Sequence, residues 1–238
     1  MSHLAYYEYQ ATARGIRSIE DVKANASGRA HVYRRIVLPR LPANKQSRVA
    51  ELACGHGAFL WWLREQGYAN VEGVDSSIEQ IRFARQVASV HHAEVNQWLS
   101  NQPNSSCAAL IAIDLIEHMS KDGFAELLQS AHRVLEPNGT LILRYPNGDS
   151  PIVGRNLFAD ITHVWTYTPV CLTSLAAMHG FQRVEFVDES HQAIRDHRWL
   201  KVPISRIATA LLRSVFQAAT RETIQHFSPH LWAFLVKS

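Results

Sequence analysis

The chain has 238 residues, of which 47% are hydrophobic, and its formal net charge is only +3. That length suits one α/β domain with additions, and the weak charge, without a run of Lys or Arg, gives no sign of a nucleic-acid partner. Three scattered cysteines exclude a disulfide framework and a cysteine-based metal site. With no signal peptide and no apolar run near about 18 residues, we expect a cytoplasmic protein.

Residues 1–46 are predicted to be helical and to end at the proline-containing segment Leu38–Pro42. We expect this segment to form a cap over the ligand end of the following domain. Its aromatic and basic residues are candidates for ligand contact, and a surface helix with aromatic anchors is the simpler alternative. The candidates are Tyr6, Tyr7, Tyr9, Arg14 and Tyr33.

The next segment predicts a βαβ unit with a glycine turn. A strand, a tight turn, a helix and a second strand that ends in an acid follow in order: Arg48–Ala53, Gly55 with Gly57, Ala58–Glu65, and Val71–Val74 before Asp75. Glycines allow a ligand to approach the backbone, and the acid is suited to accept hydrogen bonds from a ribose diol. The unit is therefore typical of a nucleotide-binding α/β domain.

Two positions distinguish between ligands. A dinucleotide site would require a third glycine at position 60, which is Leu60 here. Glu51 precedes the turn, and an acid there suits a cationic amino-acid ligand better than a pyrophosphate. A nicotinamide-dependent oxidoreductase is therefore disfavoured.

The remaining pattern alternates helices and strands, which predicts a mostly parallel, seven-stranded, doubly wound sheet covered on both faces. The predicted elements are helix Ile78–Val90, a weak strand Ala93–Asn96, strand Ala108–Asp114, helix Lys121–Leu135, strand Thr140–Tyr145, helix Pro169–His179, and strands Phe181–Val187 and His230–Val236. We expect the cap to span 1–46 and the sheet domain 47–238. Ligands are expected at the carboxyl ends of the strands.

Two segments lie outside the minimal pattern. Pro146–Thr168 is a long connection at the ligand end, where such loops often carry function. Trp199–Thr220 predicts a helical insert before the last strand, with one apolar face and several basic residues. A basic amphipathic helix suits peripheral contact with an anionic membrane, whereas packing on the sheet or on a second subunit of a homodimer is the simpler alternative.

Three motifs in order carry a family resemblance. The segment Glu51–Gly57 resembles the first motif of class I S-adenosylmethionine-dependent methyltransferases, with Ala53 where a glycine is usual. The segment Asp114–His118 resembles their Asp-x-x-Glu-His motif, and Leu135, Pro137 and Gly139 match the Leu-x-Pro-x-Gly entry to a strand. The resemblance covers roughly residues 48–190 and implies a Rossmann-like fold. It also implies S-adenosyl-L-methionine as cofactor and S-adenosyl-L-homocysteine as product.

The resemblance also implies which residues bind the cofactor. Asp75 would bind the ribose, Ser76 would line the adenine pocket, and Asn96 or Gln97 would meet the adenine amino group. Asp114 and His118 would face the methionine end, although Asp114 or Ser120 as a helix cap is an alternative. The full set of expected cofactor-binding residues is Glu51, Ala53, Cys54, Gly55, Gly57, Asp75, Ser76, Asn96, Asp114, Leu115 and His118.

The loop after the fifth strand holds the candidates for acceptor chemistry. His163 is the predicted base for a hydroxyl acceptor, with Asp160 orienting its ring, and a loop histidine bonded to its own backbone is the alternative. Trp165 and Tyr167 are candidates to stack on a sugar ring. Oxygen ligands for a divalent ion are present, but no spacing compels a site, so no metal is predicted; they are Asp114, Glu117, Asp149 and Asp160.

The same loop carries a narrower resemblance. Its segments resemble methyltransferases associated with bacterial surface polysaccharide and lipopolysaccharide assembly: Asn147–Pro151, Gly154–Arg155, Asp160–His163 and Thr168–Pro169. That implies O-methylation of a sugar hydroxyl, with a saccharide or lipid-linked acceptor at the inner face of a membrane. The alternatives are N- or O-methylation of a small metabolite of quinone or natural-product type, and a binding protein that keeps the fold without chemistry.

Overall fold

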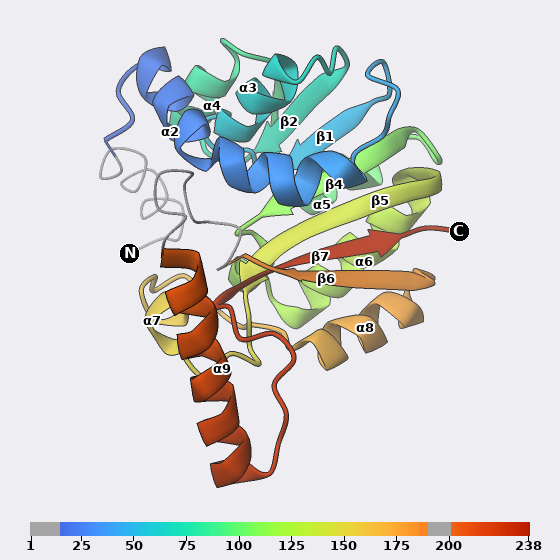
Figure 1. Ribbon diagram of the computed structural model, residues 1–238. Helices are drawn as coiled ribbons and strands as arrows, with labels where there is room; N and C mark the ends of the chain where they lie inside the picture. Colours follow the sequence, from blue (N-terminus) through green and yellow to red (C-terminus); the bar gives the residue numbers. More distant parts are fainter. Residues whose placement is uncertain (1–14, 190–200) are drawn as a thin grey trace.

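A seven-stranded sheet forms the centre of the molecule (Figure 1). The computed structural model describes residues 15–189 and 201–238. The strand order is β3-β2-β1-β4-β5-β7-β6; β1 to β5 pair in parallel, and β7 runs antiparallel to both β5 and β6. The strands are β1 Val49–Leu52, β2 Val71–Asp75, β3 Ser89–His92, β4 Cys107–Ile113, β5 Leu135–Pro146, β6 Arg183–Asp188 and β7 His230–Val236.

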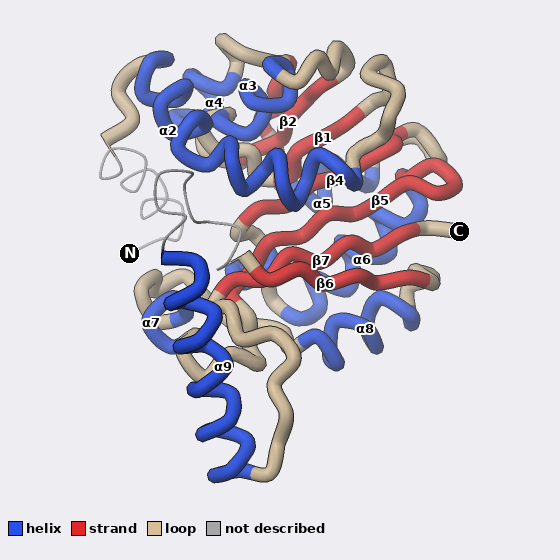
Figure 2. The backbone as a smooth tube through the Cα atoms, viewed as in Figure 1, coloured by secondary structure: helices blue, strands red, loops and turns tan. Residues whose placement is uncertain are grey.

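Helices connect the strands and cover both faces of the sheet (Figure 2). They are α2 Ile19–Val32, α3 Ala58–Glu65, α4 Ile78–Ala84, α5 Val95–Ser100, α6 Lys121–Val134, α7 Gly154–Leu157, α8 Pro169–Met178 and α9 Lys201–Thr220. A short π-helix, Tyr33–Val37, and a 3₁₀ turn, Leu38–Arg40, extend α2. Another 3₁₀ turn, Ile116–His118, follows β4. Side-chain caps define several starts: Ser18 forms a capping box with Asp21, and Thr168 caps α8.

Alternation along the strands separates two hydrophobic cores. In β1, Val49 packs into the core beneath α2, α3 and α4, whereas the adjacent Ala50 faces the core beneath α5, α6 and α8. Because successive side chains of a strand point to opposite faces, a sheet covered on both sides must be apolar throughout. Leu110, Ile111 and Ala112 in β4 are accordingly fully buried. The predicted doubly wound, Rossmann-like α/β class is confirmed.

The third strand was predicted in the wrong place. β3 is Ser89–His92, not Ala93–Asn96, and most of the predicted strand belongs to α5 or its entry. β3 is an edge strand that pairs only with β2, and Val90 is its one buried side chain. Its polar sequence therefore lacked the apolar run of an inner strand. The preceding helix α4 ends at Ala84, before the predicted Val90, because Ser89 and Val90 belong to β3.

The other boundaries differ by a few residues. β7 matches its prediction at both ends, while β5 begins at Leu135, five residues before the predicted Thr140. The segment Glu136–Gly139, which includes the Pro137 and Gly139 of the predicted strand entry, is part of that strand, and the register against β4 is shifted there. Apolar periodicity locates the buried half of a strand well but misses a polar extension.

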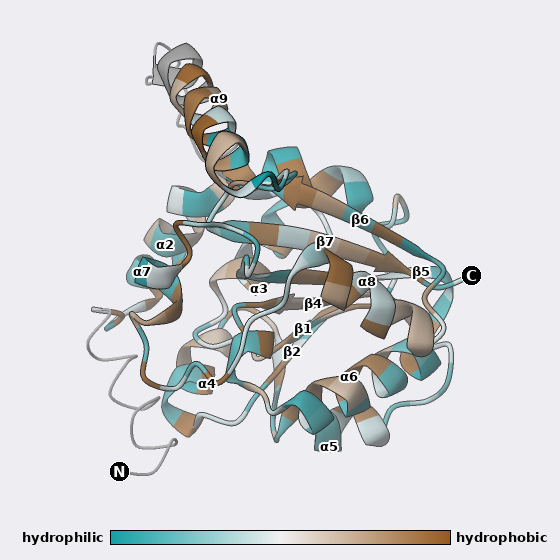
Figure 3. Cartoon of the chain, turned by 90° about the horizontal axis from the view of Figure 1, so that it is seen from below, coloured by the Kyte–Doolittle hydropathy of each residue, from teal (hydrophilic) through white to brown (hydrophobic). Residues whose placement is uncertain are grey.

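The structure describes only part of the predicted N-terminal segment 1–46 and of the predicted insert Trp199–Thr220. Helical structure from Ile19 to Arg40 agrees with the predicted helical N-terminal segment, and Tyr6, Tyr7, Tyr9 and Arg14 lie outside the described residues. α9 agrees with the predicted insert and stands away from the sheet, with apolar residues along its outer surface (Figures 1 and 3). Within residues 15–189 and 201–238, no helix is both long and apolar enough to cross a membrane.

Candidate functional site

A cleft of about 1170 Å³ lies at the carboxyl ends of β1, β2 and β4. The α2 helix closes one side through Asn25 and Arg29, together with Tyr33 just after it, and the loop after β5 closes another. The predicted site residues that line it are Glu51, Ala53, Cys54, Gly55, Asp75, Ser76, Asn96, Asp114, Leu115, His118, Asp160 and His163. The fold therefore gathers into one cleft residues that are more than a hundred positions apart.

The glycine turn forms the floor of the cleft beside β1. Ala53, Gly55 and Gly57 all have left-handed backbone, with φ of 55°, 52° and 84°. A Cβ on Gly57 would lie 2.8 Å from the backbone of Ala84, so glycine allows α3 and α4 to pack together. Gly57 is thus predicted correctly as part of the turn, but it does not line the cleft.

Asp75 joins the glycine turn to the loop that follows β2. Its carboxylate accepts the backbone N–H of Gly55 and that of Ser77, each at 2.8 Å. Burial raises the pKa of Asp75, although these two hydrogen bonds favour its charged form. Each carboxylate oxygen has a second lone pair, so the group retains acceptors for a ligand in the cleft.

Glu51 is a buried acid that faces the cleft. It is 4% exposed, and its Oε2 has no hydrogen-bond partner within the described parts of the chain. Burial raises the pKa of Glu51 well above its usual range, and the neighbouring Asp75 adds to the shift. A buried carboxyl with a spare oxygen is stabilised by a cationic ligand, which would restore its charged form.

An ion-pair network behind the cleft was missed by the sequence analysis. Arg144, at the end of β5, pairs with Asp114 and with Glu189, whose Oε1 lies 3.0 Å from Nη2. Trp232 in β7 donates to Glu189 at 2.9 Å, and Arg29 in α2 reaches Glu189 at 3.3 Å. The signal that could have revealed it is a lone arginine within the apolar run of β5.

This network changes the expected environment of Asp114. Burial alone would raise its pKa, but the charges of Arg144 and Arg29 outweigh burial and lower it. Asp114 was expected to face a cationic ligand directly, whereas here it already has a guanidinium partner, and its side chain remains 39% exposed. His230, which also lines the cleft, has its pKa lowered to about 4 by burial and by Arg144.

The predicted pairing of Asp160 with His163 is replaced by a different arrangement. Asp160 accepts the Thr162 hydroxyl at 2.6 Å, and that hydroxyl lies 2.9 Å from Nδ1 of His118. His163 instead directs its Nδ1 at the carbonyl of Leu157, 2.7 Å away. A carbonyl only accepts, so Nδ1 carries the proton and Nε2 of His163 keeps its lone pair.

A second hollow of about 910 Å³ adjoins the cleft and shares Ala159, Asp160 and His163 with it. Trp165 lines this hollow and is 46% exposed, with the Lys121 ammonium 4.0 Å from its ring centre. Tyr167 was predicted to stack on an acceptor, but it is 2% exposed and packs on Phe124 in the core. Trp165 is therefore the aromatic side chain of this pair that is available to a ligand.

Asn96 reaches the cleft from an unexpected element. It lies in α5, not in a strand, and its Nδ2 donates to the Gly123 carbonyl at 2.9 Å and to Glu126 at 3.0 Å. Asp149, considered as a metal ligand, is not among the residues lining the cleft.

Comparison with known proteins gives consistent results. A family model described as "Methyltransferase domain" matches residues 26–186, and no curated protein matches by sequence. A SAM-dependent methyltransferase from Archaeoglobus fulgidus is similar over 98% of this chain and 99% of its own, with a TM-score of 0.68 and 20% identity. A possible histamine N-methyltransferase from Thermotoga maritima is similar over 99% and 100%, with a TM-score of 0.65 and 14% identity.

A third similar structure was solved with a ligand. Phosphoethanolamine N-methyltransferase 2 from Haemonchus contortus, in complex with S-adenosyl-L-methionine, has a TM-score of 0.59 at 13% identity and covers 94% of this chain and 60% of its own. These structural similarities establish the fold, and the family match covers more than half of the chain. The chain therefore belongs to the methyltransferase-domain family and is an S-adenosylmethionine-dependent methyltransferase.

Proposed function

We propose that the protein transfers the methyl group to a sugar hydroxyl, and that the cleft binds the cofactor through those predicted residues that line it. The floor fits the cofactor: the left-handed backbone at Gly55 lets a ligand approach the turn closely, and Glu51 offers an unpartnered carboxylate oxygen to a cationic group. Asp75 would accept the ribose hydroxyls. When bound, the cofactor supplies an activated methyl group.

The observation that carries the acceptor proposal is the position of His163. It lies where the cleft meets the second hollow, and its Nε2 has the lone pair needed to draw a proton from a hydroxyl. The exposed ring of Trp165 in the same hollow offers a surface on which a sugar ring can stack. The loop motifs that resemble polysaccharide-associated methyltransferases support the same acceptor class.

His163→Ala is expected to lower turnover on a hydroxyl acceptor by roughly 100-fold or more, because the general base is lost. Cofactor affinity should stay unchanged, since His163 lies on the acceptor side. The measurement is transfer of a labelled methyl group to nucleotide-linked and lipid-linked sugars, with amines and quinols in parallel. His179→Ala, a half-buried histidine outside the cleft, is the matched control.

The same assay also tests whether the acceptor is an amine, which would contradict the sugar proposal. An amine acceptor needs no strong base, so full turnover of an amine by His163→Ala would replace the sugar proposal with N-methylation of a small metabolite. N-methyltransferases among similar structures make amines a necessary arm of the screen.

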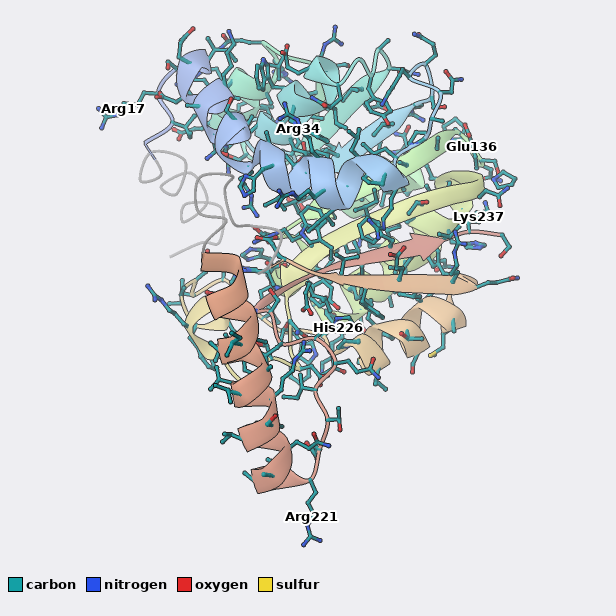
Figure 4. The ribbon with its side chains drawn as sticks, viewed as in Figure 1. Arg17, Arg34, Glu136, Arg221, His226 and Lys237 are labelled. Carbon is teal, nitrogen blue, oxygen red and sulfur yellow. The ribbon has the colours of Figure 1, made fainter. Side chains whose placement is uncertain are left out.

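We further propose that α9 makes peripheral contact with an anionic membrane that carries the acceptor. Its exposed apolar side chains are Ile207, Leu211, Leu212 and Val215, at 61%, 63%, 52% and 65% exposure. Arg221 follows α9 and points away from the body (Figure 4). An exposed apolar stripe with basic neighbours suits the surface of an anionic bilayer.

The protein is expected to sediment with vesicles that contain phosphatidylglycerol and much less with pure phosphatidylcholine. Replacing Leu211 and Val215 together with glutamate should lower vesicle affinity by roughly tenfold or more. Gln217→Glu, an exposed position on the opposite side of the same helix, is the control for added charge. Equal affinity of both variants, or dimerisation through α9 in sedimentation velocity without lipid binding, would contradict the membrane proposal.

A further inference from the structure

Three side chains converge on the acceptor side of the cleft. One carboxylate oxygen of Glu117 and one ring nitrogen each of His118 and His163 lie within 4.8 Å of one another. Glu117 and His118 follow β4 in one 3₁₀ turn, whereas His163 comes from the loop after β5. The ring centres of the two histidines are 4.7 Å apart.

The backbone fixes these two segments against each other. The N–H of Val164, next to His163, donates to the carbonyl of Glu117 at 2.7 Å. The relay from Asp160 through the Thr162 hydroxyl to Nδ1 of His118 joins the same two segments a second time. Two sets of hydrogen bonds therefore hold the segments that carry these three side chains in a fixed position relative to each other.

Both imidazoles are oriented as metal ligands usually are. The Thr162 hydroxyl gives its proton to Asp160, so it accepts from Nδ1 of His118; the Leu157 carbonyl accepts from Nδ1 of His163. Each ring is therefore held through its Nδ1, and coordination of an ion would use Nε2. A hydrogen bond from the second ring nitrogen to a carboxylate, a carbonyl or a group that they hold is typical around metal-bound histidines.

Glu117 is the third side chain of this group and gives an independent indication that a ligand binds here. Its side chain is 1% exposed, and Oε2 has no hydrogen-bond partner among the described residues. A buried carboxylate oxygen without a partner is costly unless a ligand or an ion satisfies it.

We propose that Glu117, His118 and His163 bind a divalent transition-metal ion, with Zn²⁺ or Mn²⁺ as the best-suited ions. Two imidazoles and one carboxylate form a ligand set that leaves coordination positions open for a further ligand. Ligand atoms around such an ion lie about 3.3 Å apart, so small side-chain rotations would close the three groups on it.

This inference rests on the proposed hydroxyl acceptor and deepens it. The bound ion would take the acceptor oxygen as a ligand and lower the pKa of the hydroxyl, whose proton passes to solvent. The oxygen then forms a bond to the methyl carbon while the bond from that carbon to sulfur breaks, and S-adenosyl-L-homocysteine leaves. In this arrangement His163 would hold the ion in place of acting as the base, and the loss of turnover in His163→Ala would arise from loss of the ion.

Metal binding is measured without cofactor or acceptor. Chelator-treated protein is titrated calorimetrically with Zn²⁺ and with Mn²⁺, and Co²⁺ loading is followed by its visible absorption. We expect about one ion per chain, with binding weakened at least 100-fold in Glu117→Gln and in His163→Ala. Thr162→Val, which removes the relay to His118 without changing volume, should weaken binding by roughly 10–100-fold.

Controls separate the site from adventitious binding. His179→Ala should bind the ion as the unmodified protein does, and circular dichroism with thermal melts confirms that each variant folds. Absence of binding to the unmodified protein at micromolar ion would overturn the proposal. Unchanged affinity in both Glu117→Gln and His163→Ala would also overturn it, because the ion would then be bound elsewhere.

Activity distinguishes this proposal from the proposed function. If the ion activates the hydroxyl, Glu117→Gln loses turnover together with His163→Ala; if His163 acts directly as a base, Glu117→Gln keeps turnover. Full sugar methylation by metal-free protein would overturn the ion's role and leave the sugar acceptor in place. Stoichiometric binding without sugar methylation would leave the metal site and remove the sugar acceptor.

Discussion

Replacing Arg144 with methionine is expected to destabilise the fold by about 3–5 kcal/mol. Arg144 is 4% exposed and is the shared partner of Glu189 and Asp114. Removing it would leave the Glu189 carboxylate buried, with Trp232 and the more distant Arg29 as its remaining hydrogen-bonding side-chain partners among the described residues. Asp114 is more exposed and would be hydrated, so most of the cost arises at Glu189.

Urea denaturation of the variant measures this loss. Arg183→Met, an exposed arginine on β6, should change the free energy of unfolding by less than about 0.5 kcal/mol. The double variant Arg144→Met with Glu189→Leu should recover much of the stability, since the uncompensated charge is removed. A double variant no more stable than Arg144→Met would show that packing, not charge, accounts for the loss.

The pH dependence of stability gives a second reading of the same network. Burial would raise the pKa of Glu189, but its hydrogen bond and charge pairing with Arg144 lower it from 4.5 to about 2. A depressed carboxyl pKa stabilises the folded state above its unfolded value, and that stabilisation disappears as the pH falls from about 4.5 to about 2. The difference in the free energy of unfolding between the unmodified protein and Arg144→Met should therefore become smaller as the pH falls from about 4.5 to about 2.

Asp75→Ala is expected to weaken binding of S-adenosyl-L-methionine by roughly tenfold or more, as two charge-assisted hydrogen bonds to the ribose are lost. The variant also frees the N–H groups of Gly55 and Ser77, which loosens the glycine turn. Calorimetric titration with the cofactor and its product measures the loss, with NADH as a ligand that should not bind. Asp122→Ala, an exposed acid in α6, is the matched control.

Asp75→Asn separates the two contributions. Its carbonyl oxygen keeps one of the two acceptors, so a loss between those of the unmodified protein and Asp75→Ala is expected. Equal affinity in all three proteins would exclude the ribose assignment, even though Asp75 lines the cleft.

The sequence predicted correctly those parts of the fold that short runs of residues determine by themselves. The apolar run of β4 and the glycine turn after β1 need no distant partner to be recognised. β3 was misplaced because an edge strand has half its contacts, and its sequence reflects solvent more than a core. Tyr167 was misjudged because an aromatic residue in a loop looks the same whether it faces a ligand or Phe124.

The site shows the same division. Glu51 and Asp75 were predicted because a motif fixes their position at strand ends. Arg144 was missed because its role depends on Glu189, 45 residues later, and on β7, which comes later still. The relay through Thr162 to His118 likewise joins residues 44 positions apart, and no local spacing encodes it.

The position of β7 also determines when the sheet can be completed during synthesis. β7 is made last of the seven strands, yet it occupies the slot between β5 and β6. Until it emerges, both neighbours present open edges that invite pairing with other chains. Trp232 arrives with β7, so Glu189 gains that hydrogen bond only in the final step. A nascent chain that stalls before residue 230 would therefore have nearly all of the residues that line the cleft, but β5 and β6 would keep unpaired edges that favour aggregation.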